Sequence, residues 1–178
     1  MDPVRYRILG TTQALRSDGT PVAVGGARLR ALLTVLALRA GRTVPVELLV
    51  EEVWAADPPA DAPAALQALV GRLRRTVGAD AIASADGGYR LTAPPDAVDL
   101  HRFERLTADG LRALTDGDPA GATVLLDDAL ALWQGPALAD LPDRTAEAAR
   151  REAAAWTPNA PATPPPSPSA TPSSPCPS

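Results

Sequence analysis

The sequence predicts an α+β fold: a small antiparallel sheet, three helices, a β-hairpin, and then a second, all-helical region. Apolar residues first recur at every second position, as in a strand. They then recur at three- and four-residue intervals, as in a helix, and later return to alternation. Turn-forming glycines and prolines separate these stretches.

The chain begins with strand-like sequence. VRYRIL alternates in polarity, with Val4, Tyr6 and Ile8 on the face expected to be buried. RSDGT at 16–20 is typical of a turn, and PVAVG after it is typical of a short strand. Together these stretches predict the N-terminal antiparallel sheet.

Two helices are predicted next. The first covers 25–41, ends at Gly41, and has one buried stripe, made of Leu29, Leu32, Leu33, Leu36 and Ala40. The second covers 44–57, with Pro45 near its first turn and a Pro-Pro pair after it as the stop signal.

The third helix covers 61–78, between Asp61 as N-cap and Gly78 as C-terminal signal. A helical wheel separates a buried stripe from an opposite face. On that face, small residues lie in the N-terminal part of the helix and arginines in the C-terminal part. The stripe consists of Leu66, Leu69, Val70, Leu73 and Val77. The polar residues outside the stripe are Gln67, Arg72, Arg74 and Arg75.

Residues 81–93 predict a β-hairpin, with Arg90 beside its Gly-Gly tip. A helix pair followed by such a hairpin is a helix-turn-helix with a wing. In that setting Gln67 can make a bidentate contact to adenine, the arginines can reach guanine edges or phosphates, and Arg90 can reach the DNA backbone or minor groove. The alternative for the helix is a solvated arginine face that serves solubility.

Residues 94–156 are predicted to form a partial helical domain. A helical hairpin comes first, with Asp118 as N-cap and Pro119 at the first position of its second helix, which is expected to end at Gly135. A third helix is expected over 143–156. Trp54 and Trp133, each near a helix end, are expected to be core anchors. Residues 157–178 contain nine prolines and no charge, so a disordered tail is predicted.

Charge and composition limit the function classes. Residues 1–93 carry 11 Arg against 9 Asp and Glu, whereas residues 94–178 carry 6 Arg against 12 acidic residues. A mildly basic first half fits a nucleic-acid-binding module.

The sole Cys176 and sole His101 cannot supply a usual metal site, and no catalytic motif surrounds them, so neither a cofactor nor an enzymatic activity is expected. The absence of a signal peptide or long apolar run predicts a cytoplasmic protein.

Residues 4–141 resemble the Streptomyces antibiotic regulatory protein (SARP) group of regulators. The matching stretches are RLRALLTVLALRAGRTV, LLVEEVW, AALQALVGRLRR, GGYRLTAPPDAVDLHRFERL and GDPAGATVLLDDALALWQGPALADL. The group joins an OmpR-type winged helix to a helical, tetratricopeptide-like bacterial transcriptional activation domain. The resemblance implies a transcriptional activator, often of secondary-metabolite genes, that binds directly repeated sites in double-stranded DNA and contacts RNA polymerase.

By the same resemblance, Gln67, Arg72, Arg74 and Arg75 lie on the recognition helix and Arg90 lies on the wing. The segment 55–62 is implied to face polymerase, and a homodimer on DNA is possible. The chain departs from the family pattern at four positions: Pro45, where a Ser cap is usual, Ala64 for Asn, Leu69 for Tyr, and Gly71 for Ser. The proline-rich sequence from 157 replaces further helices, so the activation domain is expected to be truncated, with an uncapped apolar face.

The alternative function is a protein-interaction module. In that hypothesis the incomplete helical repeat is the working surface, and the winged helix binds DNA weakly or not at all.

Overall fold

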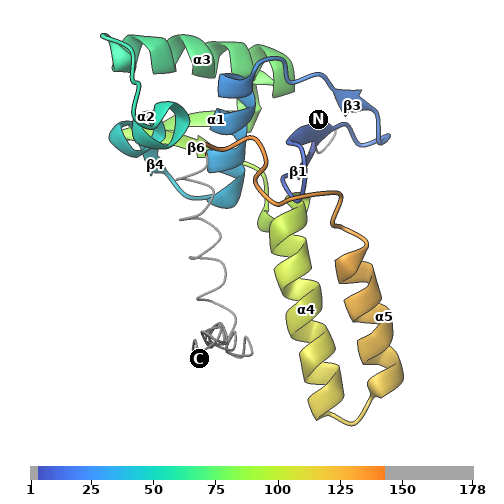
Figure 1. Cartoon of the computed structure of the whole chain (residues 1–178). Coiled ribbons are helices and arrows are strands. Elements are labelled where there is room, and N and C mark those ends of the chain that lie inside the picture. The colour runs from blue at the N-terminus through green and yellow to red at the C-terminus, as the bar shows by residue number, and fades with distance from the viewer. Residues whose placement is uncertain (1–3, 143–178) are drawn as a thin grey trace, which may run out of the picture.

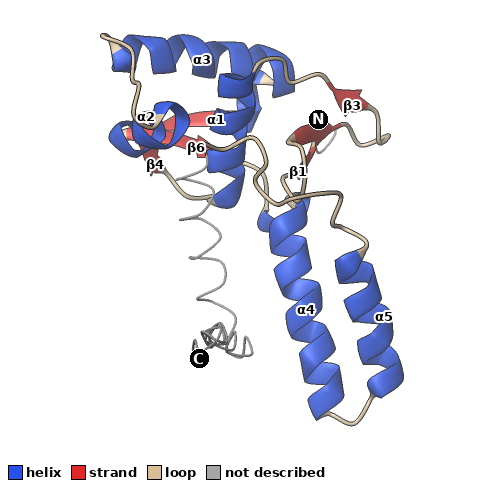
Figure 2. Ribbon diagram, viewed as in Figure 1, coloured by secondary structure: helices blue, strands red, loops and turns tan. Residues whose placement is uncertain are grey.

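The structure is a computed structural model that describes residues 4–142. The chain forms an upper part, which holds α1, α2, α3 and both small sheets, and a lower part, which is a hairpin of the helices α4 and α5 (Figure 1). Figure 2 shows that the strands of both sheets belong to the upper part. The predicted fold class, a winged helix with small antiparallel sheets followed by a helical region, is confirmed.

The first sheet contains the strands β1 (Arg5–Arg7), β2 (Gln13–Leu15) and β3 (Pro21–Val22), paired antiparallel in that order. Tyr6 and Ile8 are buried, as the alternation predicts. The 16–20 turn is closed by the Gly19 N–H, which donates to the Arg16 carbonyl at 2.9 Å. This sheet lies on the same hydrophobic core as the helices that follow.

Helix α1 (Ala27–Leu38) is shorter than predicted and buried on more than one side. The predicted stripe is buried, but so are further residues around the helix, including Ala31, Thr34, Val35 and Ala37. The reason is tertiary: α2, α3 and the wing strand β6 all contact α1, and the N-terminal sheet reaches it through Thr12. The prediction of one buried stripe was therefore too narrow.

The predicted second helix divides into a strand and a helix. Val44–Pro45 form β4, which pairs with the wing, and α2 covers Val46–Trp54. Pro45 precedes the helix as its N-cap instead of lying inside its first turn. The helix ends before the Pro-Pro pair, because Ala55 has φ +52°, a left-handed conformation that stops the helix. Trp54 is half-buried and packs against the core.

Helix α3 (Ala62–Val77) agrees closely with its prediction. The side chain of Asp61 caps it by accepting from the Ala64 N–H at 3.1 Å, and Gly78 follows its last residue. A short 3-10 turn, η1 (Ala79–Ala81), leads into the hairpin of β5 (Ile82–Ala85) and β6 (Gly88–Leu91). The second sheet has the order β4-β6-β5, so β6 is its central strand.

After a 3-10 turn, η2 (Pro95–Ala97), come α4 (Asp99–Thr115) and α5 (Pro119–Leu130). The helices approach closely where Gly110 meets Leu126. Asp118 caps α5 as predicted, but α5 ends at Leu130, before the expected glycine. The expected helix over 143–156 and the expected tail over 157–178 lie outside the described residues.

The helical hairpin leaves large apolar side chains exposed: Leu111, Leu114, Val124, Leu130 and Trp133. The prediction that Trp133 is a core anchor was wrong, since 41% of this residue is exposed. Its ring stands edge-on to Phe103, with centroids 5.5 Å apart. Neither ring belongs to the main core formed by the described residues.

Asp99 joins the helical hairpin to the first sheet. Its buried carboxylate accepts from the backbone N–H groups of Ile8 at 2.8 Å and Leu9 at 3.0 Å. Val98, next to it, forms a parallel bridge with Tyr6. Burial raises the pKa of Asp99 above 3.8, although hydrogen bonds from Ile8, Leu9 and Leu100 act in the opposite direction. The Asp99 carboxylate thus accepts from the backbone N–H groups of the two residues that follow β1.

Residues 131–142, which we call the return segment, run back from α5 to the upper part (orange in Figure 1). Leu138 and Leu141 are buried in the main core. Two backbone N–H groups of the segment donate to the first sheet: Gln134 to the Leu9 carbonyl at 2.9 Å and Leu138 to the Ile8 carbonyl at 3.0 Å. Gly10 has φ +142°, and a side chain there would press on Gln134. The upper core is therefore incomplete without residues from beyond 93.

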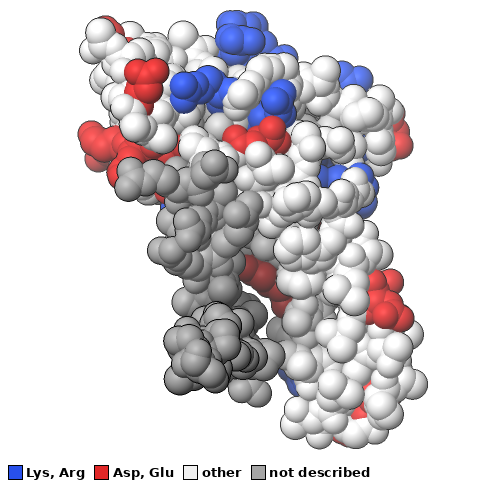
Figure 3. Space-filling model, in the orientation of Figure 1, with Lys and Arg blue, Asp and Glu red and all other residues white. Residues whose placement is uncertain are grey.

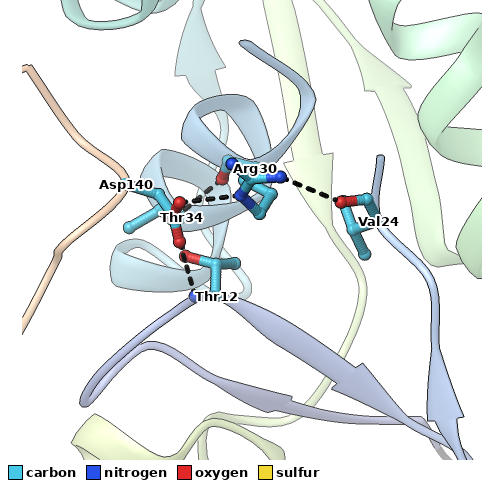
Figure 4. Close-up of polar contacts among 5 residues, drawn as sticks. All are labelled: Thr12, Val24, Arg30, Thr34 and Asp140. Atoms are coloured by element: carbon cyan, nitrogen blue, oxygen red, sulfur yellow. Dashed lines mark hydrogen bonds and ion pairs between the residues drawn. The ribbon is translucent and has the colours of Figure 1, made fainter. Parts of the chain in front are cut away.

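Asp140 links the return segment by hydrogen bonds to α1 and to Thr12, the residue before β2 (Figure 4). It accepts from Arg30 Nε at 2.7 Å and from the Thr12 N–H at 2.6 Å. Thr34 Oγ1 donates to the Arg30 carbonyl, so the Thr12 hydroxyl donates to Thr34 Oγ1, 2.6 Å away. Burial alone would raise the pKa of Asp140, but the hydrogen bonds from Arg30 and Thr12 outweigh it and hold the pKa below 3.8.

His101 makes a second contact between the helical hairpin and α1. Its Nε2 lies 3.2 Å from the Ala37 carbonyl, and its Nδ1 lies 3.2 Å from Glu104 Oε2. Both partners are acceptors, so only the imidazolium, with two N–H groups, can donate to both. The hydrogen bond to Glu104 raises the pKa of His101 above 6.5, against the opposing effect of burial.

Within residues 4–142, none of the helices has the length and apolar character needed to cross a membrane.

Replacing Asp99 with Ala should lower the free energy of unfolding by about 2–4 kcal/mol, because two buried N–H donors lose their acceptor. Urea unfolding of the full chain measures this change. Asp96→Ala is the matched control: Asp96 lies on the same junction but forms an exposed ion pair with Arg105, so its loss should cost less than about 1 kcal/mol. Equal effects of the two variants would contradict the role of Asp99.

Stability should also depend on the protonation of His101. Because the folded pKa is raised, the contribution of His101 is complete below pH 6.5 and is lost as pH rises through the raised pKa. Thermal unfolding from pH 6 to pH 8.5 should therefore show a falling Tm, and His101→Gln should remove this component. A difference between wild type and variant that stays constant with pH would disprove the assignment.

Candidate nucleic-acid interface

Helix α3 separates an inner face from an outer face. All five predicted stripe residues are buried: Leu66, Leu69, Val70, Leu73 and Val77. Gln67, Arg72 and Arg75 are exposed on the other side. With 16 residues, α3 is about 24 Å long at 1.5 Å per residue, which is enough to cross a DNA major groove.

The guanidinium groups of Arg72, Arg75 and Arg90 are free of ion pairs and side-chain hydrogen bonds to any residue within 4–142. Arg90 lies on the central wing strand β6, opposite Ala83 of β5, and its side chain is exposed. An arginine in this state can give its full fork of donors to a phosphate or a guanine edge.

Arg74 differs from the other arginines of α3, because the fold itself occupies its side chain. Its Nε donates to the Ile82 carbonyl at 2.9 Å, and its Nη2 donates to Ser84 Oγ at 2.9 Å. The guanidinium carbon also lies 5.9 Å from the ring centroid of Tyr89. The structure therefore places Arg74 between α3 and the wing, whereas the sequence pattern grouped it with the other arginines outside the buried stripe.

Three positions on the outer face of α3 carry small residues: Ala64, Ala68 and Gly71. Ala64 and Ala68 are exposed, and a Cβ added at Gly71 would meet only Arg75 Nη1, at 3.9 Å. Small side chains at these positions allow the helix backbone to approach a groove floor. At Gly71 the absence of a side chain is thus a property of the surface and is not required by packing.

The wing requires a glycine next to its turn. Gly88 opens β6 opposite Pro45, and a Cβ there would collide with the Val44 carbonyl of β4. The preceding Gly87 has φ +77° and completes the turn with Asp86. The Val46 N–H donates to the Gly87 carbonyl at 3.1 Å, which ties the wing tip to the start of α2.

Basic side chains gather over the end of the molecule where α3 lies, and acidic side chains gather near α2 (Figure 3). The exposed acids of α2 are Glu47 and Glu51, while Glu52 is paired with Arg39 at 2.8 Å. The surface of the upper part is thus polarised, with its positive side over α3. Such a charge distribution favours approach of a polyanion to α3.

Comparisons with known proteins agree with this geometry. Residues 21–91 match the family model "Transcriptional regulatory protein, C terminal", and residues 98–159 match "Bacterial transcriptional activator domain". The chain is 36% identical over 155 residues to the regulatory protein AfsR of Streptomyces griseus, covering 87% of this chain and 16% of that protein. It is 40% identical over 145 residues to the transcriptional regulator RedD of Streptomyces coelicolor, covering 77% of this chain and 41% of RedD.

A solved structure shows the same fold. The structure of Mycobacterium tuberculosis EmbR in complex with a low-affinity phosphopeptide matches with a TM-score of 0.76 and 31% identity, over 87% of this chain and 42% of that chain. This chain belongs to the family of SARP-type regulators. It spans less than half the length of AfsR, RedD and EmbR. Because the matched proteins are regulators, the comparisons do not favour the alternative of an interaction module that binds little or no DNA.

Gly88→Ala should lower the free energy of unfolding by about 2–3 kcal/mol, because the added methyl group forces β6 away from β4. Gly71→Ala is the matched comparison: its methyl group points into open space within a helix, and it should stabilise the protein by about 0.5–1 kcal/mol. Chemical unfolding of both variants tests this pair, and an unchanged stability of Gly88→Ala would refute the close approach.

Proposed function

We propose that this SARP-type regulator binds duplex DNA with sequence preference and activates transcription. The observation that carries the proposal is the division of α3 into a fully buried stripe and an outer face with exposed Arg72 and Arg75, beside a wing that presents Arg90. In this arrangement α3 enters the major groove and the wing reaches the adjacent backbone or minor groove.

Each outward-facing residue has a distinct role in the proposal. Gln67 offers an amide that pairs bidentately with adenine, and Arg72 and Arg75 offer forks for guanine edges or phosphates. Arg90 supplies a phosphate or minor-groove contact. The small side chains of Ala64 and Gly71 allow close approach but contribute no polar contact of their own.

We propose further that the segment 55–62, which joins α2 to α3, faces RNA polymerase. The loop is exposed at Ala56, Asp57 and Pro58, and it lies at the end of the acidic helix α2, away from the basic face of α3. Direct-repeat sites would place two copies of the chain side by side on DNA in a cytoplasmic complex. The helical hairpin, with exposed Leu111 and Leu114, offers a second surface for protein contacts.

Arg72→Ala and Arg75→Ala should each weaken binding to the preferred duplex by roughly 1–3 kcal/mol if the residue reads a base. The duplex comes from selection with the full chain on a random pool, and fluorescence anisotropy gives the affinities. Arg112→Ala is the control: it removes the same charge from the exposed surface of α4, and its effect should be within about 0.5 kcal/mol.

The salt dependence of binding separates phosphate contacts from base contacts. The slope of log K against log salt should decrease in magnitude by about 0.9 for each phosphate contact that a variant removes. Failure of the wild-type chain to enrich any duplex at low salt would overturn the proposed DNA binding.

A further inference from the structure

We infer that Arg74 is a positioning residue that sets the wing relative to the recognition helix, and that it acts on DNA through Arg90. This role rests on the DNA binding proposed above. It assigns to Arg74 a different task from that of Arg72 and Arg75, although all three arginines lie within four positions of one helix.

The first argument comes from the position of β5 in its sheet. In the order β4-β6-β5, strand β5 is an edge strand, and its outward carbonyl groups have no strand partner. Arg74 Nε supplies the missing donor to the Ile82 carbonyl, and Nη2 extends the contact to Ser84 along the same strand. Two donors of one planar group thus hold two positions of β5.

The second argument is that Arg74 also contacts β6, the strand paired with β5. Its guanidinium lies over the Tyr89 ring on β6, and Tyr89 is the neighbour of Arg90. One side chain of α3 therefore contacts both strands of the wing. Since the fork is planar and the ring is flat, this contact restrains the orientation of the hairpin as well as its distance from α3.

The consequence concerns where Arg90 can reach. DNA engagement requires α3 and the wing to meet different parts of the duplex at the same time, so their relative orientation decides whether both contacts form. Without Arg74 the hairpin remains attached by its pairing with β4 and by the buried side chains of Ile82 and Leu91. We therefore expect Arg74 variants to fold but to lose the contribution of Arg90 to the affinity for DNA.

A double-mutant cycle on the full chain tests this coupling. In the wild-type background, Arg90→Ala should weaken binding to the selected duplex about tenfold, the effect of one charged hydrogen bond. In the Arg74→Ala background the same change should weaken binding less than about twofold, because the wing contact has already been lost. Arg72→Ala is the matched comparison and should keep its full effect in both backgrounds.

Arg74→Lys separates positioning from a direct phosphate contact. Lysine keeps the charge but cannot donate to a carbonyl, donate to a hydroxyl and stack on a ring in the same geometry. We expect Arg74→Lys to weaken binding nearly as much as Arg74→Ala. The slope of log K against log salt should be the same for Arg74→Ala with and without Arg90→Ala, whereas two independent phosphate contacts would differ by about 0.9.

The outcomes are distinguishable. Multiplicative effects of Arg74→Ala and Arg90→Ala, or wild-type affinity of Arg74→Lys, would overturn the positioning role and leave the proposed DNA binding intact. Failure of the wild-type chain to bind any duplex would overturn both. Thermal unfolding shows whether each variant is folded. If Arg74→Ala does not fold, Arg74→Lys and the exposed Ser84→Ala serve as the backgrounds for Arg90→Ala, and full effects of Arg90→Ala in both would refute the role.

Discussion

The burial of helix α1 is the constraint on which the rest of the structure depends. A helix whose side chains are apolar on most of its circumference must be covered on most of its circumference. Helices α2 and α3 cover part of α1, the wing sheet covers a second part, and the N-terminal sheet reaches it through Thr12. The orientation of α3, and therefore of its exposed arginines, follows from this packing.

The same constraint connects the two halves of the chain. The winged-helix core is completed by Val98, Leu138 and Leu141, which come from beyond the predicted boundary at 93. Polar contacts hold these residues in place: the buried Asp99 binds the backbone after β1, and the part-buried Asp140 binds Thr12 and Arg30. The predicted boundary at 93 therefore separates segments that share one core.

Hydrogen bonding within the fold also decides which arginines of α3 remain available for a ligand. The edge of β5 needs a donor, and Arg74 is close enough to provide it, so its side chain is committed to the wing. Arg72 and Arg75 lie on the outer side of the same helix and remain exposed. The contacts of Arg74 with Ser84 and Tyr89 join α3 to the wing, and the sequence pattern did not predict them.

The sequence by itself determined the periodic and local features: the helices and their caps at Asp61 and Asp118, the buried stripe of α3, the hairpin with its Gly-Gly turn, and the α+β order. These features depend on neighbours within a few residues, which periodicity and turn chemistry report directly. The tertiary structure alone decided that Val44–Pro45 form a strand, that α1 is buried nearly all round, that Trp133 is exposed, and that Arg74 holds the wing. Each of these outcomes depends on contacts between segments distant in the chain, and local sequence carries little information about such contacts.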